Sequence, residues 1–231
     1  MSRRMRKYIC CGVALAVLAG GGMALSHFRS REGADKTPPM GAIAAAERSP
    51  RRKHEVREVV MSAPVSRGNL YARALPSLAE PHLVVEKSQG RLVVYDGGKA
   101  VKAYRVVTGS DVGDKVREGD RRTPEGEFYI CVRNAQSQFT RSLGLSYPSL
   151  EDAERGLRDG LITRAEAQRI REAIRGRRQP PWKTALGGEI MLHGGGADRP
   201  AGTAGCVGMD DADIRELFAA LKLGTPVTIR R

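Results

Sequence analysis

The chain has 231 residues and a formal net charge of +13, so anionic surroundings such as peptidoglycan, anionic lipid or nucleic acid are expected. Aromatic residues make up only 5% of the chain and no nucleic-acid-binding motif is present, which argues against a nucleic-acid partner. The length fits one domain of about 150 residues behind a polar N-terminal part, and it excludes a second domain with a sizeable core.

The N-terminus has the pattern of an export signal. Basic residues precede an apolar run at residues 9–25. We expect residues 1–26 to be a signal peptide or, because the run reaches the lower length limit for crossing a bilayer, an anchor in the inner membrane. Positive charges before such a run place the rest of the chain in the periplasm or cell envelope. Residues 27–80 are basic and lack apolar periodicity, which predicts a flexible linker.

The first part of the domain, which spans residues 81–231, has the spacing of a β meander. Asp96-Gly97-Gly98 is a strong hairpin signal between two apolar stretches. Residues 109–122 are polar and glycine-containing, which indicates a surface loop. Strands are predicted at residues 83–86, 91–95, 100–108 and 126–132.

The pattern turns helical in the middle of the domain. Ser149 with Asp152, and Thr163 with Glu166, have the spacing of helix-capping boxes. Together they predict a helical hairpin inserted into a β domain. Trp182, just beyond it, either packs the insertion onto the sheet or forms a wall of a substrate groove.

The C-terminal part predicts a helix and a strand. Asp210 or Asp211 can cap a helix running to about Leu221. Apolar residues recur there at helical spacing, and Gly224 ends the helix before an apolar strand.

A glycine-dense segment contains one histidine and one cysteine, His193 and Cys206. A thiolate nucleophile needs a base to take its proton and backbone amides to stabilise an oxyanion, and glycines permit close backbone approach. These residues predict a Cys/His acyl-transfer site. The alternatives are a structural cysteine and histidine, or a zinc site, for which a second Cys/His pair is missing. Cys131, in an apolar strand-like run, is expected in the core, which leaves Cys206 as a reduced thiol.

Three motifs in order resemble the L,D-transpeptidase catalytic domain (YkuD-type) family. They are Thr123-Pro124-Glu125-Gly126-Glu127-Phe128, then His193-Gly194 with Thr203-Ala204-Gly205-Cys206, and Gly224-Thr225-Pro226-Val227. The resemblance implies a mainly β fold, an L,D-transpeptidase-like β-sandwich carrying the helical hairpin and a C-terminal helix and strand.

One departure from the family pattern concerns the position two residues after the cysteine. Many members have arginine there, where this chain has Gly208. This version, with residues 143–148 upstream, resembles a murein L,D-transpeptidase-like subgroup in which some members hydrolyse wall linkages.

The resemblance also implies roles for individual residues. Cys206 is the nucleophile, His193 the base, and the Gly194 carbonyl orients the imidazole. The backbone amides of Gly205 and Cys206 are the expected oxyanion donors. Thr203 either orients the loop or contacts substrate, and Tyr147 either caps the substrate or packs in the core. No metal and no cofactor are implied.

The expected function is that of a cysteine-dependent L,D-transpeptidase in cell wall biogenesis and cell shape. It would act on peptidoglycan stem peptides, forming 3–3 crosslinks or attaching an amine acceptor such as a wall-attached protein. Two alternatives stay open: an L,D-hydrolase that cleaves stem-peptide or wall-protein linkages, and a non-catalytic wall-binding protein on the same fold.

Overall fold

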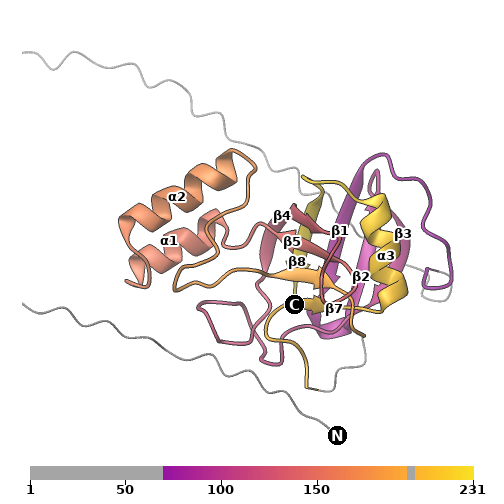
Figure 1. The fold of residues 1–231 in the computed structure, drawn as a ribbon, viewed down its shortest axis with the longest axis horizontal. Coiled ribbons are helices and arrows are strands. Elements are labelled where there is room, and N and C mark those ends of the chain that lie inside the picture. Colours follow the sequence, from indigo (N-terminus) through magenta and orange to yellow (C-terminus); the bar gives the residue numbers. More distant parts are fainter. Residues whose placement is uncertain (1–69, 197–200) are drawn as a thin grey trace, which may run out of the picture. The chain divides into compact units, whose positions relative to one another are not determined.

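The structure, a computed structural model, describes residues 70–196 and 201–231 (Figure 1). The expected signal peptide or anchor at residues 1–26, with its apolar run at 9–25, lies outside the described residues, as does most of the expected linker. Within the described ranges, none of the helices combines the length and the apolar character needed to span a bilayer.

The described chain contains a curled sheet of eight strands in the order β3-β2-β1-β8-β4-β5-β6-β7 (Figure 1). The predicted mainly β fold is therefore confirmed. The strands are β1 (Pro81–Glu86), β2 (Arg91–Asp96), β3 (Lys99–Arg105), β4 (Gly126–Asn134), β5 (Ser142–Leu145), β6 (Met191–His193), β7 (Val207–Gly208) and β8 (Pro226–Arg230).

The predicted meander is formed by β1, β2 and β3, which pair antiparallel. Gly97 and Gly98 both have positive φ, at 53° and 81°, and make the two-residue turn between β2 and β3. β3 ends at Arg105, earlier than predicted, because the chain then leaves the strand to form bridges with the segment around the cysteine. A short 3-10 helix, η1 (Lys87–Gln89), connects β1 and β2.

The last strand of the chain occupies a central place in the sheet. β8 pairs in parallel with β1 on one side and antiparallel with β4 on the other. It therefore joins the meander to the part of the sheet that contains His193. Neither this placement nor the short strands β5 and β7 was expected from the sequence.

The predicted helical hairpin is confirmed as α1 (Leu150–Arg158) and α2 (Arg164–Arg175), which lie to one side of the sheet in Figure 1. Both capping boxes form, at Ser149 and at Thr163. The hairpin has a small core of its own, made by Ala153, Ile162, Ala167, Ile170 and Leu186. Trp182 is half-buried against Gly144 of β5, and a Cβ added to that glycine would lie 3.1 Å from Trp182 Cη2.

The C-terminal helix is α3 (Asp211–Ala220), close to the predicted span. Its apolar face, with Ile214 and Leu217 fully buried, joins the main core made by the inner side of the sheet. Its first residue, Asp211, lies beside the histidine loop, so this helix also contributes to the site described next.

Candidate active site

His193 and Cys206 are brought together by two neighbouring parallel strands. His193 is the last residue of β6, Cys206 immediately precedes β7, and Leu192 pairs with Val207. Both residues line one cavity of about 460 Å³. The other residues that line it are Asn134, Ser137, Gln138, Phe139, Ser142, Glu189 and Met191.

The imidazole of His193 is buried and held in a defined orientation. Its Nδ1 lies 2.5 Å from the carbonyl oxygen of Gly194, and its ring packs against the ring of Phe139 with centroids 4.7 Å apart. A carbonyl oxygen only accepts, so Nδ1 carries the hydrogen and Nε2 is the basic nitrogen. The contact between His193 and Gly194 is the one that the family resemblance implied.

The loop after His193 is anchored to the start of α3 by Asp211. The Asp211 carboxylate accepts hydrogen bonds from the Gly195 N–H at 2.8 Å and from the Thr140 hydroxyl at 2.7 Å. Both hydrogen bonds lower the pKa of this carboxyl below its ordinary value, and the bond from the Thr140 hydroxyl has the larger effect. A Cβ at Gly194 would lie 2.5 Å from Asp211 Oδ1 and 2.8 Å from the Phe139 carbonyl, so only glycine fits there.

The thiol of Cys206 is half-buried, and its Sγ donates to the Glu189 carbonyl at 3.5 Å. Burial raises the pKa of this thiol, and the negative charge of the Glu189 carboxylate raises it further. A hydrogen bond from the Met191 backbone N–H and the positive charge of Lys115 act in the opposite direction and favour the thiolate.

Two buried threonine hydroxyls hold the loop that carries Cys206. Thr123, which is fully buried, donates to the Gly205 carbonyl at 2.9 Å and accepts from the Gly109 N–H at 2.8 Å. Thr203 donates to the Cys206 carbonyl at 2.6 Å and accepts from the Gly205 N–H at 3.1 Å. Both partners of the Thr203 hydroxyl therefore belong to the loop that carries Cys206.

Two expected roles do not fit the geometry. The N–H of Gly205 is occupied by the Thr203 hydroxyl, so this amide is not available to the cavity as an oxyanion donor. Tyr147 is fully buried, its hydroxyl donates to the Leu186 carbonyl at 2.9 Å, and it does not line the cavity. Of the two roles open to Tyr147, the structure therefore favours packing in the core, because the hydroxyl finds its partner inside the protein.

Three residues that shape the site carried no functional signal in the sequence. Phe139 packs on the histidine ring, Glu189 lines the cavity beside Cys206, and Asp211 anchors the histidine loop. Thr123 belongs to one of the family motifs, but the motif did not indicate that it supports the cysteine loop.

The second cysteine in the described residues, Cys131, is half-buried in β4 and free, as is Cys206. Burial raises the pKa of the Cys131 thiol to about 12, so it stays protonated at neutral pH. Of the two thiols, only Cys206 lies on the same cavity as the histidine.

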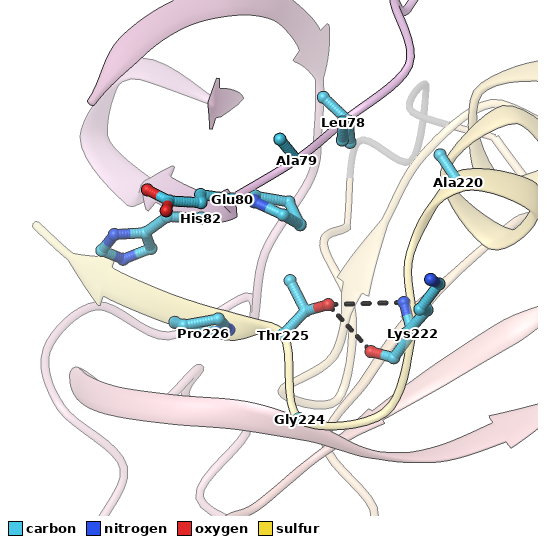
Figure 2. A pocket seen from close by; sticks show the side chains of 10 residues that line it. Leu78, Ala79, Glu80, His82, Ala220, Lys222, Gly224, Thr225 and Pro226 are labelled. Carbon is cyan, nitrogen blue, oxygen red and sulfur yellow. Dashed lines mark hydrogen bonds between the residues drawn. The ribbon is translucent and has the colours of Figure 1, made fainter. Parts of the chain in front are cut away.

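A separate cavity of about 430 Å³ lies between the start of β1, the end of α3 and the start of β8 (Figure 2). Its Thr225 hydroxyl is bonded to the backbone of Lys222, as the dashed lines in Figure 2 show. Its histidine, His82, has Nε2 2.7 Å from the Thr228 hydroxyl, and burial lowers its pKa, which favours the neutral ring. This cavity lacks a nucleophile next to a base and is not a candidate catalytic site.

No group of three or more His, Cys, Asp or Glu side chains suited to bind a metal ion occurs within residues 70–196 and 201–231.

The similarity to solved structures is low in sequence. Bd1075 from Bdellovibrio bacteriovorus is 23% identical over 66% of this chain and 48% of its own, with a TM-score of 0.45. Pgp2, the helical cell shape determining protein from Campylobacter jejuni, is 21% identical over 66% of this chain and 48% of its own, with a TM-score of 0.47. An L,D-transpeptidase from Xylanimonas cellulosilytica is 16% identical over 68% and 64%, with a TM-score of 0.41.

This chain spans about half the length of the first two of these proteins. No curated protein matches it. The family model of the L,D-transpeptidase catalytic domain (YkuD), by contrast, matches residues 80–229, which is more than half of the chain and includes both His193 and Cys206. The chain therefore belongs to the L,D-transpeptidase catalytic domain family, whose members act on peptidoglycan.

Proposed function

We propose that this protein is a cysteine-dependent L,D-transpeptidase of the cell envelope that acts on peptidoglycan stem peptides. The observation that carries the proposal is the shared cavity of His193 and Cys206, with the Gly194 carbonyl on the imidazole Nδ1. Residues 1–26 direct export in this proposal, either as a cleaved signal peptide or as a membrane anchor.

The first half of the reaction forms an acyl-enzyme. His193 Nε2 takes the proton of Cys206, and Sγ attacks the carbonyl of an L-centre that is joined to a terminal D-residue. The C–S bond forms, the C–N bond to the D-residue breaks, and the proton moves from His193 to the leaving amine. The Cys206 N–H, in the loop that the two threonines hold, is the proposed oxyanion donor, a role worth about 3 kcal/mol in comparable sites.

The second half transfers the acyl group to an acceptor. A neutral amine of a second stem peptide, or of a wall-attached protein, attacks the thioester carbon. The new C–N bond forms, the C–S bond breaks, and the amine proton passes through His193 back to the sulfur. The Gly194 carbonyl favours each step in which the imidazole becomes charged, because it accepts from the Nδ1–H.

A hydrolase is the second candidate, and the environment of Gly208 favours it. Gly208 stands where many family members have arginine, and a Cβ at this position would lie 3.1 Å from Val107 Cγ1. The position is therefore closely packed and offers no cation to a carboxylate of an incoming acceptor. Water would then resolve the thioester and release the stem peptide or a wall-linked protein.

Mass spectrometry of tetrapeptide-bearing muropeptides, and of wall carrying a linked protein, distinguishes these reactions. The full-length wild type is compared with Cys206→Ala and with the matched control Cys131→Ala, the other free cysteine of the described residues. New dimers or amine adducts that are lost only in Cys206→Ala support a transpeptidase.

Release of the D-residue or of the linked protein without adducts, again dependent on Cys206, supports the hydrolase. Equal product with Cys206→Ala and wild type, or no thioester on Cys206 in the intact protein mass, contradicts both and leaves a wall-binding role.

A further inference from the structure

The helical insertion is joined to the loop of residues 109–122 through the guanidinium of Arg155 on α1. One terminal nitrogen donates to the Asp114 carboxylate at 2.8 Å, and the other donates to the Lys115 carbonyl at 2.6 Å. The second nitrogen also donates to Asp152 at 2.6 Å, within α1 itself. Arginine suits this position because its planar fork holds several donors in fixed directions, which a lysine ammonium does not. Arg155 therefore fixes the 109–122 loop to the insertion.

The loop that Arg155 holds is cross-linked internally by the carboxylate of Asp120. This carboxylate accepts from the buried Lys115 ammonium at 2.8 Å and from the Val116 N–H at 2.7 Å. It also accepts from the Arg122 N–H at 3.1 Å, at the far end of the loop. Because one carboxylate bonds both ends of this stretch, a displacement at Lys115 is transmitted to Arg122.

The far end of the loop lies directly against the segment that carries Cys206. The Arg122 carbonyl is so close to Gly205 that a Cβ added to the glycine would lie 2.8 Å from the carbonyl oxygen. The next residue, Thr123, donates through its hydroxyl to the Gly205 carbonyl at 2.9 Å. The position of the peptide before Cys206 therefore depends on where this loop ends.

Asp114 provides a second connection to the same segment. Its other carboxylate oxygen accepts from the Glu125 N–H at 2.8 Å, two residues after Thr123. Lys87 on η1 supports the segment as well, since its ammonium donates to the Thr123 carbonyl and to the Glu125 carboxylate, both at 2.8 Å. Arg155, acting through Asp114, and Lys87, acting directly, therefore both support the residues that hold the cysteine loop.

We propose that Arg155 is a positioning residue for the acylation step, which holds the loop of Cys206 from the helical insertion in the place that attack requires. The inference rests on the proposed function and gives the insertion a part in that reaction. Arg155 does not line the catalytic cavity, so it acts through the residues that it holds. A displacement of about 1 Å in a catalytic group costs about 10²-fold in rate, so this support affects the rate of attack and not the binding of the peptide.

The test separates the link to the loop from the stability of the insertion. Asp114→Asn keeps one carbonyl oxygen for the Glu125 N–H and places its amide nitrogen opposite Arg155. It therefore breaks the link and leaves the hydrogen bond from Arg155 to Asp152 in place. Thr163→Ala is the control for stability, because it removes the cap of α2 and leaves the link intact.

A second pair of variants removes the guanidinium itself. Arg155→Met keeps the length of the side chain and removes all its donors. Its matched control is Arg158→Met, since Arg158 is an exposed arginine of the same helix whose ion-pair partner is the exposed Asp159. Thioester formation on Cys206 is followed by intact-protein mass spectrometry of each full-length variant over a range of stem-tetrapeptide concentrations, which gives the limiting rate and KM.

We expect Asp114→Asn and Arg155→Met each to lower the limiting rate about tenfold and to leave KM within about twofold of wild type. The loss is smaller than that of a full displacement because Lys87 still holds the segment. The double variant is expected to be no slower than the slower single variant, because both changes break one link. Arg158→Met and Thr163→Ala keep the wild-type limiting rate.

Amide hydrogen exchange of residues 203–208 gives a readout that needs no substrate. We expect faster exchange there in Asp114→Asn than in wild type, because the cysteine loop opens more easily, and no change in Thr163→Ala.

A wild-type limiting rate in Asp114→Asn, or an equal slowing by Thr163→Ala, overturns the positioning role while the proposed function stands. If wild type forms no thioester with the stem peptide, the proposed function fails, and hydrogen exchange then decides whether the link holds the cysteine loop. Unchanged exchange of residues 203–208 in Asp114→Asn overturns the link as well.

Discussion

Replacing Thr123 with valine removes one hydroxyl from the support of the cysteine loop and keeps the shape of the side chain. The Gly205 carbonyl loses its donor at 2.9 Å and the Gly109 N–H loses its acceptor at 2.8 Å. Thr123 is fully buried, so water does not replace the lost partners. At about 1–3 kcal/mol for each unsatisfied backbone group, we expect Thr123→Val to lower the free energy of unfolding by about 3 kcal/mol.

The same change is expected to slow acylation, because the two hydrogen bonds fix the peptide next to Cys206. A displacement of about 1 Å in a catalytic group costs about 10²-fold in rate. Urea unfolding gives the stability, and the rate of thioester formation with a stem peptide gives the chemistry.

Thr225→Val is the matched control for Thr123→Val. Thr225 is also buried and makes two hydrogen bonds through its hydroxyl, both to the backbone of Lys222, far from the cysteine loop. We expect it to lower the free energy of unfolding by about 1–2 kcal/mol, because the exposed Lys222 backbone regains water, and to leave the acylation rate unchanged.

Two results would refute the reasoning about Thr123. One is a Thr123→Val protein whose stability is within about 0.5 kcal/mol of wild type, the range of an ordinary surface change. The other is an equal slowing of acylation by Thr123→Val and Thr225→Val. The lower rate would then result from the loss of overall stability and not from the loss of the Thr123 hydroxyl.

The remaining predictions concern the histidine loop and the two charges near the sulfur. Gly194→Ala brings a Cβ to 2.5 Å from Asp211 Oδ1, so we expect a lower melting temperature and loss of thioester formation; wild-type values for both would contradict the fit described for this loop. The pKa of the Cys206 thiol is raised, so we expect the rate of its alkylation by iodoacetamide in the free enzyme to rise with a midpoint above pH 9.0. Glu189→Gln is expected to lower this midpoint, because it removes a negative charge that raises the pKa. An unchanged midpoint would show that the Glu189 carboxylate does not act on the sulfur. Because the pKa of Asp211 is lower in the folded protein, its carboxylate stabilises the fold above pH 3.8, and this stabilisation is lost as the pH falls through the folded pKa. The free energies of unfolding of wild type and Asp211→Asn, measured in urea from pH 7 to pH 3, should therefore approach each other as the pH falls. A difference that stays constant over this range would contradict the prediction.

Sequence patterns were reliable where a few neighbouring residues decide the structure. The Gly97-Gly98 turn and the capping boxes at Ser149 and Thr163 depend on residues within a few positions of each other, and all three form as predicted. β7 has only two residues and forms because it pairs with β6 and with the segment at Val107. Its existence depends on partners far away in the sequence, which a local pattern does not contain.

In the candidate site, too, the sequence pointed to residues that stand out locally and not to contacts between distant residues. His193 and Cys206 could be singled out because of their chemistry and their glycine neighbours. Thr123 is 82 residues from Gly205, and Thr140 is 71 residues from Asp211, so these supports arise only when the sheet is formed. The hydrogen bond from the Gly205 amide to the Thr203 hydroxyl was not expected either, because the spacing of the two residues does not show which way the amide points.

The order of strands in the sheet has a consequence for how the protein is made. Synthesis proceeds from the N-terminus, and β8 follows the other seven strands of the described sheet along the chain, yet within that sheet it alone pairs with both β1 and β4. The sheet therefore cannot be completed between β1 and β4 until residues 226–230 have left the ribosome. A chain cut before Pro226 would keep every residue that lines the catalytic cavity and would lack the strand between β1 and β4.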